Sequence, residues 1–515
     1  MVSRLLCGAV AAVVALGPAA AKSANLGRWG ATIQFPSIPV SAAVLPDGNL
    51  LTWASNQPWF FEGDIGQQAS QTYTSVYNPA TGGFEATVQT SMMADMFCSG
   101  IAYLTDGRIL VNGGSSSQHT ALYDPATDSW TSDASMNISR GYNSTVTLSD
   151  GRAFTIGGSW SGDGVPKDGE IWAKNVGWAT TAVPDSAILA DDPIDDQQGY
   201  ISVGDNHPWL FAAPNGRIFH AGPGPQMNWI DTSAQGTAMS AGNRADDAYS
   251  QNGVAVMWAP GQILKAGGAP SYTDAYATTS AYVIDVTAGF ANPNVNTAIV
   301  RKAGSMAYPR AYANGVVLPG GGVLVIGGQG YAHQFYDDNS ILTPELWSPV
   351  TGTFTPLAPM ATPRNYHSVA LLMPDGRVFS GGGGLCGEGC PANHSDGAFF
   401  SPPYLFQADG STPAPRPVLV RAPASARLGD LLTVSTNGPV AAFELIRLSA
   451  TTHTVNTDQR RVPLSFWPGG STNTYDLSIP WEPGIVVPGY WMLFALDASG
   501  VPSVAKIIFI NFWSP

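Results

Sequence analysis

The stretch Asp106-Gly-Arg-Ile-Leu-Val-Asn-Gly-Gly114 joins a turn-forming pair, a short apolar strand and two glycines. The same pattern occurs at residues 47–53, 106–114, 150–158, 215–222, 261–268, 321–328 and 375–382. An Asp-Gly or Asn-Gly pair suits the tight turn of a β-hairpin, and glycines at the end of a strand let a neighbouring backbone approach closely. The repeat therefore predicts a succession of β-hairpins that pack against one another.

The number and spacing of these hairpins predict the fold. The seven copies lie about 44 to 65 residues apart, which is typical of kelch units with loop insertions. Only 12% of the residues are charged, whereas Gly (58) and Pro (40) are abundant, as expected for short strands joined by turns. We predict an all-β chain with a seven-bladed, kelch-type β-propeller over residues 25–410. The region 411–515 lacks the repeat and follows a proline-rich linker, which predicts an Ig-like β-sandwich.

The first 24 residues have the pattern of a secretory signal. Arg4 precedes an apolar run over residues 5–16, and small residues follow at 19–21. Removal of this segment would change the formal net charge from −14 to −16, since Arg4 and Lys22 would be lost. Such an acidic surface argues against nucleic acids and anionic membranes as partners. We expect a secreted, extracellular protein.

The four cysteines predict one disulfide and leave one cysteine without a cysteine partner. Cys7 lies in the signal segment, and Cys386 and Cys390 are close enough in a glycine-rich turn to form a disulfide in an oxidising compartment. Cys98 is then unpaired. It is either a buried free thiol or a residue bonded to something other than cysteine.

Residues of different chemistry occupy one position of the repeat. Cys98 and Tyr142 each lie eight residues before an Asp-Gly turn, and Tyr366 lies nine before another, with His367 beside it. If these positions converge at one mouth of the propeller, a thiol, two phenols and an imidazole face a common point. A phenolate ligand requires a strongly polarising cation, and imidazole with oxygen ligands suits Cu(II) better than a structural zinc site. The alternative is a core tyrosine beside an exposed histidine.

Several longer segments carry a family resemblance. They are Met96-Phe-Cys98, Arg140-Gly-Tyr142, Gly157-Gly-Ser-Trp-Ser-Gly162, Tyr366-His-Ser368, Gly381-Gly-Gly-Gly-Leu-Cys386, Thr452-His-Thr-Val-Asn-Thr-Asp-Gln-Arg-Arg461 and Pro488-Gly-Tyr-Trp-Met-Leu-Phe494. In order and spacing, they closely resemble the galactose oxidase group of copper radical oxidases over nearly the whole chain after the signal.

The resemblance implies a role for each matching residue. Cys98 corresponds to the cysteine joined by a thioether to the radical tyrosine, which is Tyr142 here. The tyrosine that accepts the substrate proton corresponds to Tyr366, and the indole that shields the radical corresponds to Trp160. The implied copper ligands are Tyr142, Tyr366, His367 and His453, the last on a loop of the C-terminal domain.

The resemblance also implies an activity. A primary alcohol is oxidised to an aldehyde while O₂ is reduced to H₂O₂, with one copper ion and the Cys98–Tyr142 cofactor and without flavin or nicotinamide. A peroxidase is a candidate activating partner, and a monomer is expected. The alternatives are a galactose oxidase, a glyoxal-oxidase-like enzyme, or a non-catalytic kelch propeller that binds proteins or glycans.

The chain departs from galactose oxidases where the sugar would bind. An arginine expected within residues 201–204 is missing, with Val203 there instead, and Thr273 follows Tyr272 where a glutamine is expected. Val203, Tyr272 and Thr273 are therefore candidate substrate-binding residues. Loss of such partners should weaken sugar binding. Apolar residues of predicted insertions could line the mouth instead, although blade packing would explain them equally well: Trp59, Phe60 and Phe335. We therefore predict aliphatic or aromatic primary alcohols as substrates.

Overall fold

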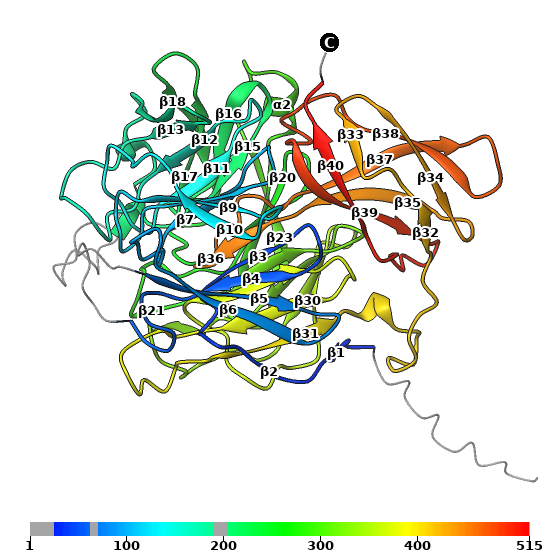
Figure 1. The fold of residues 1–515 in the computed structure, drawn as a ribbon, viewed down its shortest axis with the longest axis horizontal. Coiled ribbons are helices and arrows are strands. Elements are labelled where there is room, and N and C mark those ends of the chain that lie inside the picture. Colours follow the sequence, from blue (N-terminus) through cyan, green and yellow to red (C-terminus); the bar gives the residue numbers. More distant parts are fainter. Residues whose placement is uncertain (1–24, 62–70, 190–202, 514–515) are drawn as a thin grey trace, which may run out of the picture.

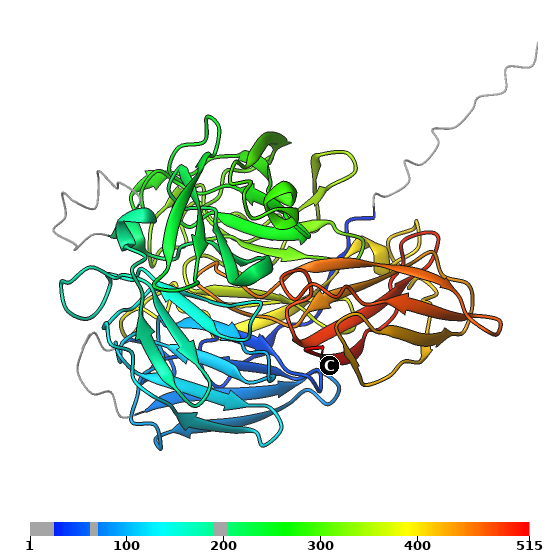
Figure 2. The same cartoon turned by 90° about the horizontal axis from the view of Figure 1, so that it is seen from above.

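The computed structural model describes residues 25–61, 71–189 and 203–513. The predicted signal segment, residues 1–24, lies outside these described residues. The structure confirms the predicted fold: seven β-sheets form a propeller, and a C-terminal β-domain packs against one side of it (Figures 1 and 2). No helix in the described ranges is long and apolar enough to cross a membrane.

Each blade begins with a strand at the central axis and continues outward by antiparallel hairpins. The first blade contains β3 (Ser41–Val44), β4 (Leu50–Trp53), β5 (Thr72–Asn78) and β6 (Gly83–Gln89), and the second contains β7 (Gly100–Tyr103), β8 (Ile109–Asn112), β9 (Thr120–Asp124) and β10 (Ser129–Ser132). The third contains β11 (Ser144–Thr147), β12 (Ala153–Ile156), β13 (Glu170–Ala173) and β14 (Gly177–Thr180), and the fourth contains β15 (Leu210–Ala212), β16 (Arg217–His220), β17 (Gln226–Asp231) and β18 (Thr237–Asn243).

The remaining blades follow the same order. The fifth contains β19 (Val254–Ala259), β20 (Gln262–Ala266), β22 (Ser280–Asp285) and β23 (Ile299–Ser305). The short helix α2 (Thr287–Ala291) lies between its two outer strands, β22 and β23. The sixth contains β24 (Asn314–Val317), β25 (Val323–Ile326), β27 (Glu345–Ser348) and β28 (Thr353–Pro356). The seventh contains β29 (Ser368–Leu372), β30 (Val378–Gly382) and β31 (Asp396–Ser401), and a small two-stranded sheet of β21 (Ala275–Tyr276) and β26 (Tyr331–Ala332) joins two insertions.

The repeat glycines lie where neighbouring backbone approaches closely. Gly114 has φ +90°, and a Cβ built on it would lie 2.2 Å from the Phe97 carbonyl oxygen. Gly158 has φ +95°, and its Cβ would lie 2.6 Å from the amide nitrogen of Asn143. Both positions require glycine, because a side chain would collide with fixed backbone. The sequence prediction for these pairs is therefore confirmed.

Strands from both ends of the described chain complete two blades. Strands β1 (Arg28–Trp29) and β2 (Ile33–Gln34) pair with β31 of the last blade. Strand β36 (Ala450–Thr452), from the C-terminal domain, pairs with β3 of the first blade and lies against β7 and β29. Figure 1 shows β36 reaching into the propeller from the orange C-terminal region. The residue that follows β36 is therefore carried to the propeller axis.

The rest of the C-terminal domain has its own sheets and its own core. Its strands are β32 (Leu419–Arg421), β33 (Ser425–Arg427), β34 (Leu431–Thr436), β35 (Ala442–Arg447), β37 (Arg461–Pro468), β38 (Thr474–Ser478), β39 (Gly489–Leu496) and β40 (Lys506–Asn511). Phe443, Leu477 and Trp491 are almost fully buried between them. Because this apolar core is separate, the domain provides a firm support from which β36 extends.

Candidate metal centre

One repeat position places six side chains at the mouth of the propeller. In each of the second to seventh blades, the residue nine positions before the turn glycine has a positive φ and lies one to three residues before the start of the innermost strand. We call this the mouth position; its occupants are Cys98, Tyr142, His207, Asn252, Tyr312 and His367. The left-handed backbone turns each of these residues out of the regular strand, at some cost for residues other than glycine.

The structure corrects the sequence count in the last blade. The residue equivalent to Cys98 and Tyr142 is His367, with φ +67°, and not Tyr366. Tyr366 comes one residue earlier, still outside β29, and both side chains are buried with 2% exposure. Their rings stack with centroids 3.9 Å apart. Because the pair lies in a turn rather than in a strand, both side chains can face the same point.

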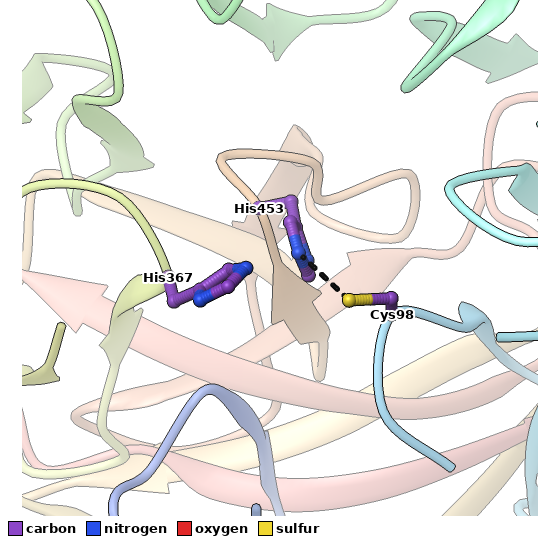
Figure 3. A group of neighbouring side chains, drawn as sticks. All are labelled: Cys98, His367 and His453. Carbon is purple, nitrogen blue, oxygen red and sulfur yellow. Dashed lines mark hydrogen bonds between the residues drawn. The ribbon is translucent and has the colours of Figure 1, made fainter. Parts of the chain in front are cut away.

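The four proposed ligands and Cys98 converge at the axis. The hydroxyl oxygens of Tyr142 and Tyr366 are 2.5 Å apart. The sulfur of Cys98 lies 3.4 Å from Nε2 of His453, and the ligand atoms of Cys98, His367 and His453 all lie within 4.8 Å of one another. Figure 3 shows these three side chains approaching from three separate segments. The first blade has Pro39 eight residues before its Asp47-Gly48 turn, and therefore no ligating side chain at this position. His453, which follows β36 beside this blade, supplies an imidazole instead.

Hydrogen bonds fix which nitrogen of each imidazole faces the centre. His367 donates from Nδ1 to the carbonyl oxygen of Gly384. His453 Nδ1 lies 2.7 Å from Oγ1 of Thr452, whose hydroxyl donates to the Val40 carbonyl oxygen at 3.0 Å. That hydroxyl therefore accepts the Nδ1 proton of His453. Both rings then present an unprotonated Nε2 to the centre, which is the usual way in which ligating histidines are oriented.

Burial keeps every group of the centre uncharged in the absence of a cation. It raises the pKa of the phenols of Tyr142 and Tyr366 well above their ordinary value. Burial also lowers the pKa of His367 to about 3, and lowers the pKa of His453 well below its usual value, with His367 as the second cause. The imidazoles thus keep their lone pairs. A phenol here becomes an anion only if a strongly polarising cation displaces its proton.

The indole of Trp160 stacks on the ring of Tyr142. The two ring centroids are 4.6 Å apart and the ring planes are 9° from parallel. Phe61 packs on Phe97 with centroids 4.7 Å apart and lies 6.1 Å from Trp160. Tyr142 is 6% exposed beneath these rings.

Sequence reasoning missed one member of the centre, His207. Its Nε2 is 2.9 Å from the hydroxyl oxygen of Tyr272, which is 3.0 Å from that of Tyr366. His207 also packs against Tyr142, with centroids 4.6 Å apart, and burial lowers its pKa to about 3. The signal was present, because His207 lies eight residues before the Asn215-Gly216 turn. Tyr272, expected to bind substrate, contacts a proposed ligand directly.

The other proposed substrate residues lie at different depths. Phe335 is half-buried and its ring centroid is 5.2 Å from that of Tyr366. Thr273 and Phe60 are partly buried, and Trp59 is 45% exposed. The side chain of Val203 lies outside the described residues, although the segment Val203–Asp205 forms a 3₁₀ turn.

The structure also contains the predicted Cys386–Cys390 disulfide, and Cys98 is a buried free cysteine.

The donor set fits copper. Nε2 of His367 is buried, and among the described residues it has no hydrogen-bond partner. An orphaned buried nitrogen costs free energy, and a metal ion would satisfy it. Two imidazole nitrogens and two phenol oxygens form an N₂O₂ set, which favours Cu(II) over the closed Cys-rich sets of structural zinc.

Comparisons with known proteins agree with this chemistry. Residues 416–510 match the model of the galactose oxidase-like early set domain, and residues 257–386 match that of the glyoxal oxidase N-terminus. Galactose oxidase of Gibberella zeae is 41% identical over 493 residues, covering 94% of this chain and 70% of that protein. The aldehyde oxidase GLOX of Vitis pseudoreticulata is 33% identical over 221 residues, covering 39% of this chain and 41% of that protein.

A solved structure shows the same architecture. It is described as a novel fungal alcohol oxidase with catalytic diversity among the AA5 family, in complex with copper. It is 41% identical to this chain, with a TM-score of 0.88, and the alignment covers 95% of this chain and all of that one.

Proposed function

The chain belongs to the galactose oxidase family of copper radical oxidases, and from that premise we propose that it oxidises aliphatic or aromatic primary alcohols in preference to galactose. In the proposed reaction, RCH₂OH and O₂ give RCHO and H₂O₂. The observation that carries the substrate class is the apolar ring of Phe335, which lies against both Tyr366 and His367. Thr273 in place of the expected glutamine favours the same class.

We propose that Tyr142, Tyr366, His367 and His453 hold one copper ion, and that Cys98 is bonded to Tyr142. Bound copper would supply one of two oxidising equivalents and a position for the alcohol oxygen. With copper bound, Tyr366 would be held as a phenolate, and its oxygen, 2.5 Å from that of Tyr142, would then accept the hydroxyl proton of the alcohol. The oxidised Tyr142 takes a hydrogen atom from the carbinol carbon. Trp160 keeps water from the ring.

The proposed substrate class is tested by a panel of alcohols. Copper-loaded, oxidised protein should release peroxide with kcat/KM for benzyl alcohol and butanol at least about tenfold above that for galactose, because the polar sugar hydroxyls find fewer partners. A highest kcat/KM with galactose would contradict the substrate class alone. The absence of both bound copper and peroxide would contradict the proposed residue roles as well.

We propose that the chain is exported with cleavage of residues 1–24, acts as a monomer, and can be activated by a peroxidase. The pattern of a positive residue, an apolar run and small residues supports export. N-terminal sequencing of the secreted protein and light scattering would test cleavage and oligomeric state. An activation assay with and without added peroxidase would test the partner.

Thr452 should set the tautomer of His453. Replacement by valine keeps the shape but removes the acceptor of the Nδ1 proton, so copper affinity should fall about 10- to 100-fold. Competition with a chelator measures the affinity. Thr452→Ser should restore it, and Thr451→Val is the matched control, because that buried threonine bonds the Val455 carbonyl instead. Equal affinities for the valine and serine variants would disprove this role.

A further inference from the structure

A short loop connects the metal centre to the edge of its mouth. We call residues 383–394 the clamp loop; it follows β30 and contains the Cys386–Cys390 disulfide. The side chain of Asn393 closes the loop a second time, because its Oδ1 accepts a hydrogen bond from the amide of Cys386 at 2.9 Å. The amide of Asn393 also donates to the carbonyl oxygen of Cys390 at 3.1 Å. The disulfide and these hydrogen bonds hold the glycine-rich clamp loop in one compact conformation.

The clamp loop contacts two aromatic segments, one inserted in the first blade and one in the sixth. Asn393 Nδ2 donates to the carbonyl oxygen of Trp59 at 3.0 Å, and the amide of Phe61 donates to that of Cys386 at 3.4 Å. The sulfur of Cys390 lies 3.8 Å from the carbonyl oxygen of Phe335. We call residues 59–61 and 331–340 the rim segments. These contacts all end on main-chain atoms of the rim segments and so restrain the backbone from which the rim aromatics extend.

The same loop is bonded to the proposed ligands. The amide of Gly384 donates to the carbonyl oxygen of Tyr366 at 2.9 Å, and the carbonyl of Gly384 accepts the Nδ1 proton of His367. Near its end, His394 Nε2 lies 2.9 Å from a carboxylate oxygen of Asp337 in the second rim segment. The loop therefore spans from the ligands at the centre to both rim segments at the mouth.

We propose that the clamp loop is a specificity device: the Cys386–Cys390 disulfide and the Asn393 side chain hold the rim aromatics at a fixed distance from Tyr366 and so determine the affinity for bulky apolar alcohols. The proposal rests on the proposed function. These residues position the rim and do not touch the reacting atoms. Phe61 lies on Phe97 and Phe335 on Tyr366, so a rim that is freed from the loop would no longer shape one common apolar wall.

The test uses two variants, Cys386→Ser/Cys390→Ser and Asn393→Ala. Asn393→Ala keeps the disulfide and provides the same test if the double cysteine variant does not fold. In both variants, KM for benzyl alcohol should rise about fivefold or more, with kcat changed less than about twofold and KM for butanol changed less. The copper EPR spectrum should remain that of the wild type, because no proposed ligand is altered.

A second readout does not depend on activity. Hydrogen exchange of the Phe61 amide, measured by mass spectrometry, should become about tenfold faster or more in both variants, because its acceptor belongs to the clamp loop. Ser395→Ala is the matched control, since it removes the Asn393-His-Ser395 glycosylation signal and keeps the Asn393 amide; it should behave as the wild type.

Unchanged exchange at Phe61 overturns the clamp proposal even if the wild type oxidises no alcohol. An equal rise in KM for butanol and benzyl alcohol together with a fall in kcat or a changed copper spectrum also overturns it, because the loop would then act only on the metal centre. A wild type without alcohol oxidation but with faster exchange in the variants contradicts the proposed function and leaves the physical clamp supported.

Discussion

Replacement of Tyr142 by phenylalanine is expected to lower kcat for alcohol oxidation by about 10⁴-fold or more, since groups that act as one catalytic unit lose nearly all function when one is removed. The change deletes a single oxygen atom, and the ring can still pack under Trp160 at a similar distance. Phenylalanine can neither ligate copper nor be oxidised as a phenol. His367, His453 and Tyr366 remain, so copper should still bind, with an altered EPR spectrum.

Tyr312→Phe is the matched control. Tyr312 occupies the mouth position of the sixth blade with φ +60°, is 1% exposed, and donates its hydroxyl proton to the Tyr272 carbonyl oxygen. Its loss removes a buried hydrogen bond without removing a proposed ligand, so kcat should stay within about tenfold of wild type. A Tyr142→Phe enzyme with kcat comparable to that of Tyr312→Phe would show that Tyr142 carries no essential redox role.

The hairpin repeat explains how much of the centre is readable from the sequence. A fixed distance from turn to mouth makes Cys98, Tyr142 and His367 equivalent, because each blade repeats one hairpin geometry. The same rule also marks His207, which lies eight residues before the Asn215-Gly216 turn. The sequence pattern places Tyr366 at the mouth position, although it lies one residue before it, and only the turn before β29 lets Tyr366 and His367 converge.

Other parts of the centre have no such local signal. His453 follows β36, which crosses from the C-terminal domain to pair with β3, and no spacing in the repeat encodes that long-range pairing. It was identified through the family resemblance alone. The rim is also non-local, because Trp59 and Asn393 are linked by a hydrogen bond across a separation of 334 residues. Contacts between insertions depend on loop conformations that the apolar pattern of strands does not specify.

The role of Cys98 separates two copper chemistries that the geometry allows. Cys98, His367 and His453 alone form a His₂Cys group, which is the ligand type of blue-copper electron-transfer sites. A thiolate ligand would require loss of the Cys98 proton, yet burial raises the pKa of this thiol well above its ordinary value. Cys98 and Tyr142 lie in one buried cluster, and a thioether between them would form with loss of the thiol hydrogen and one ring hydrogen, a two-electron oxidation for which copper and O₂ would be the oxidants.

Cys98→Ser is therefore expected to keep copper and lose activity. Without the sulfur substituent the Tyr142 phenol is harder to oxidise, so its reduction potential rises. A tenfold change in a one-electron equilibrium corresponds to about 59 mV, so a rise on the order of 180 mV would lower the oxidised fraction about 10³-fold. Mass spectrometry of the wild type should show one peptide joining residues 98 and 142, and the variant should show two. In a blue-copper site the same substitution would instead abolish the intense thiolate absorption and weaken copper binding, while the wild-type peptides would be unjoined. In a cross-linked site Cys98→Ser lowers kcat, keeps copper affinity and separates the joined peptides, because a thioether sulfur tunes the tyrosine. In a blue-copper site it lowers copper affinity and leaves the peptide masses unjoined as before, because a thiolate sulfur holds the metal.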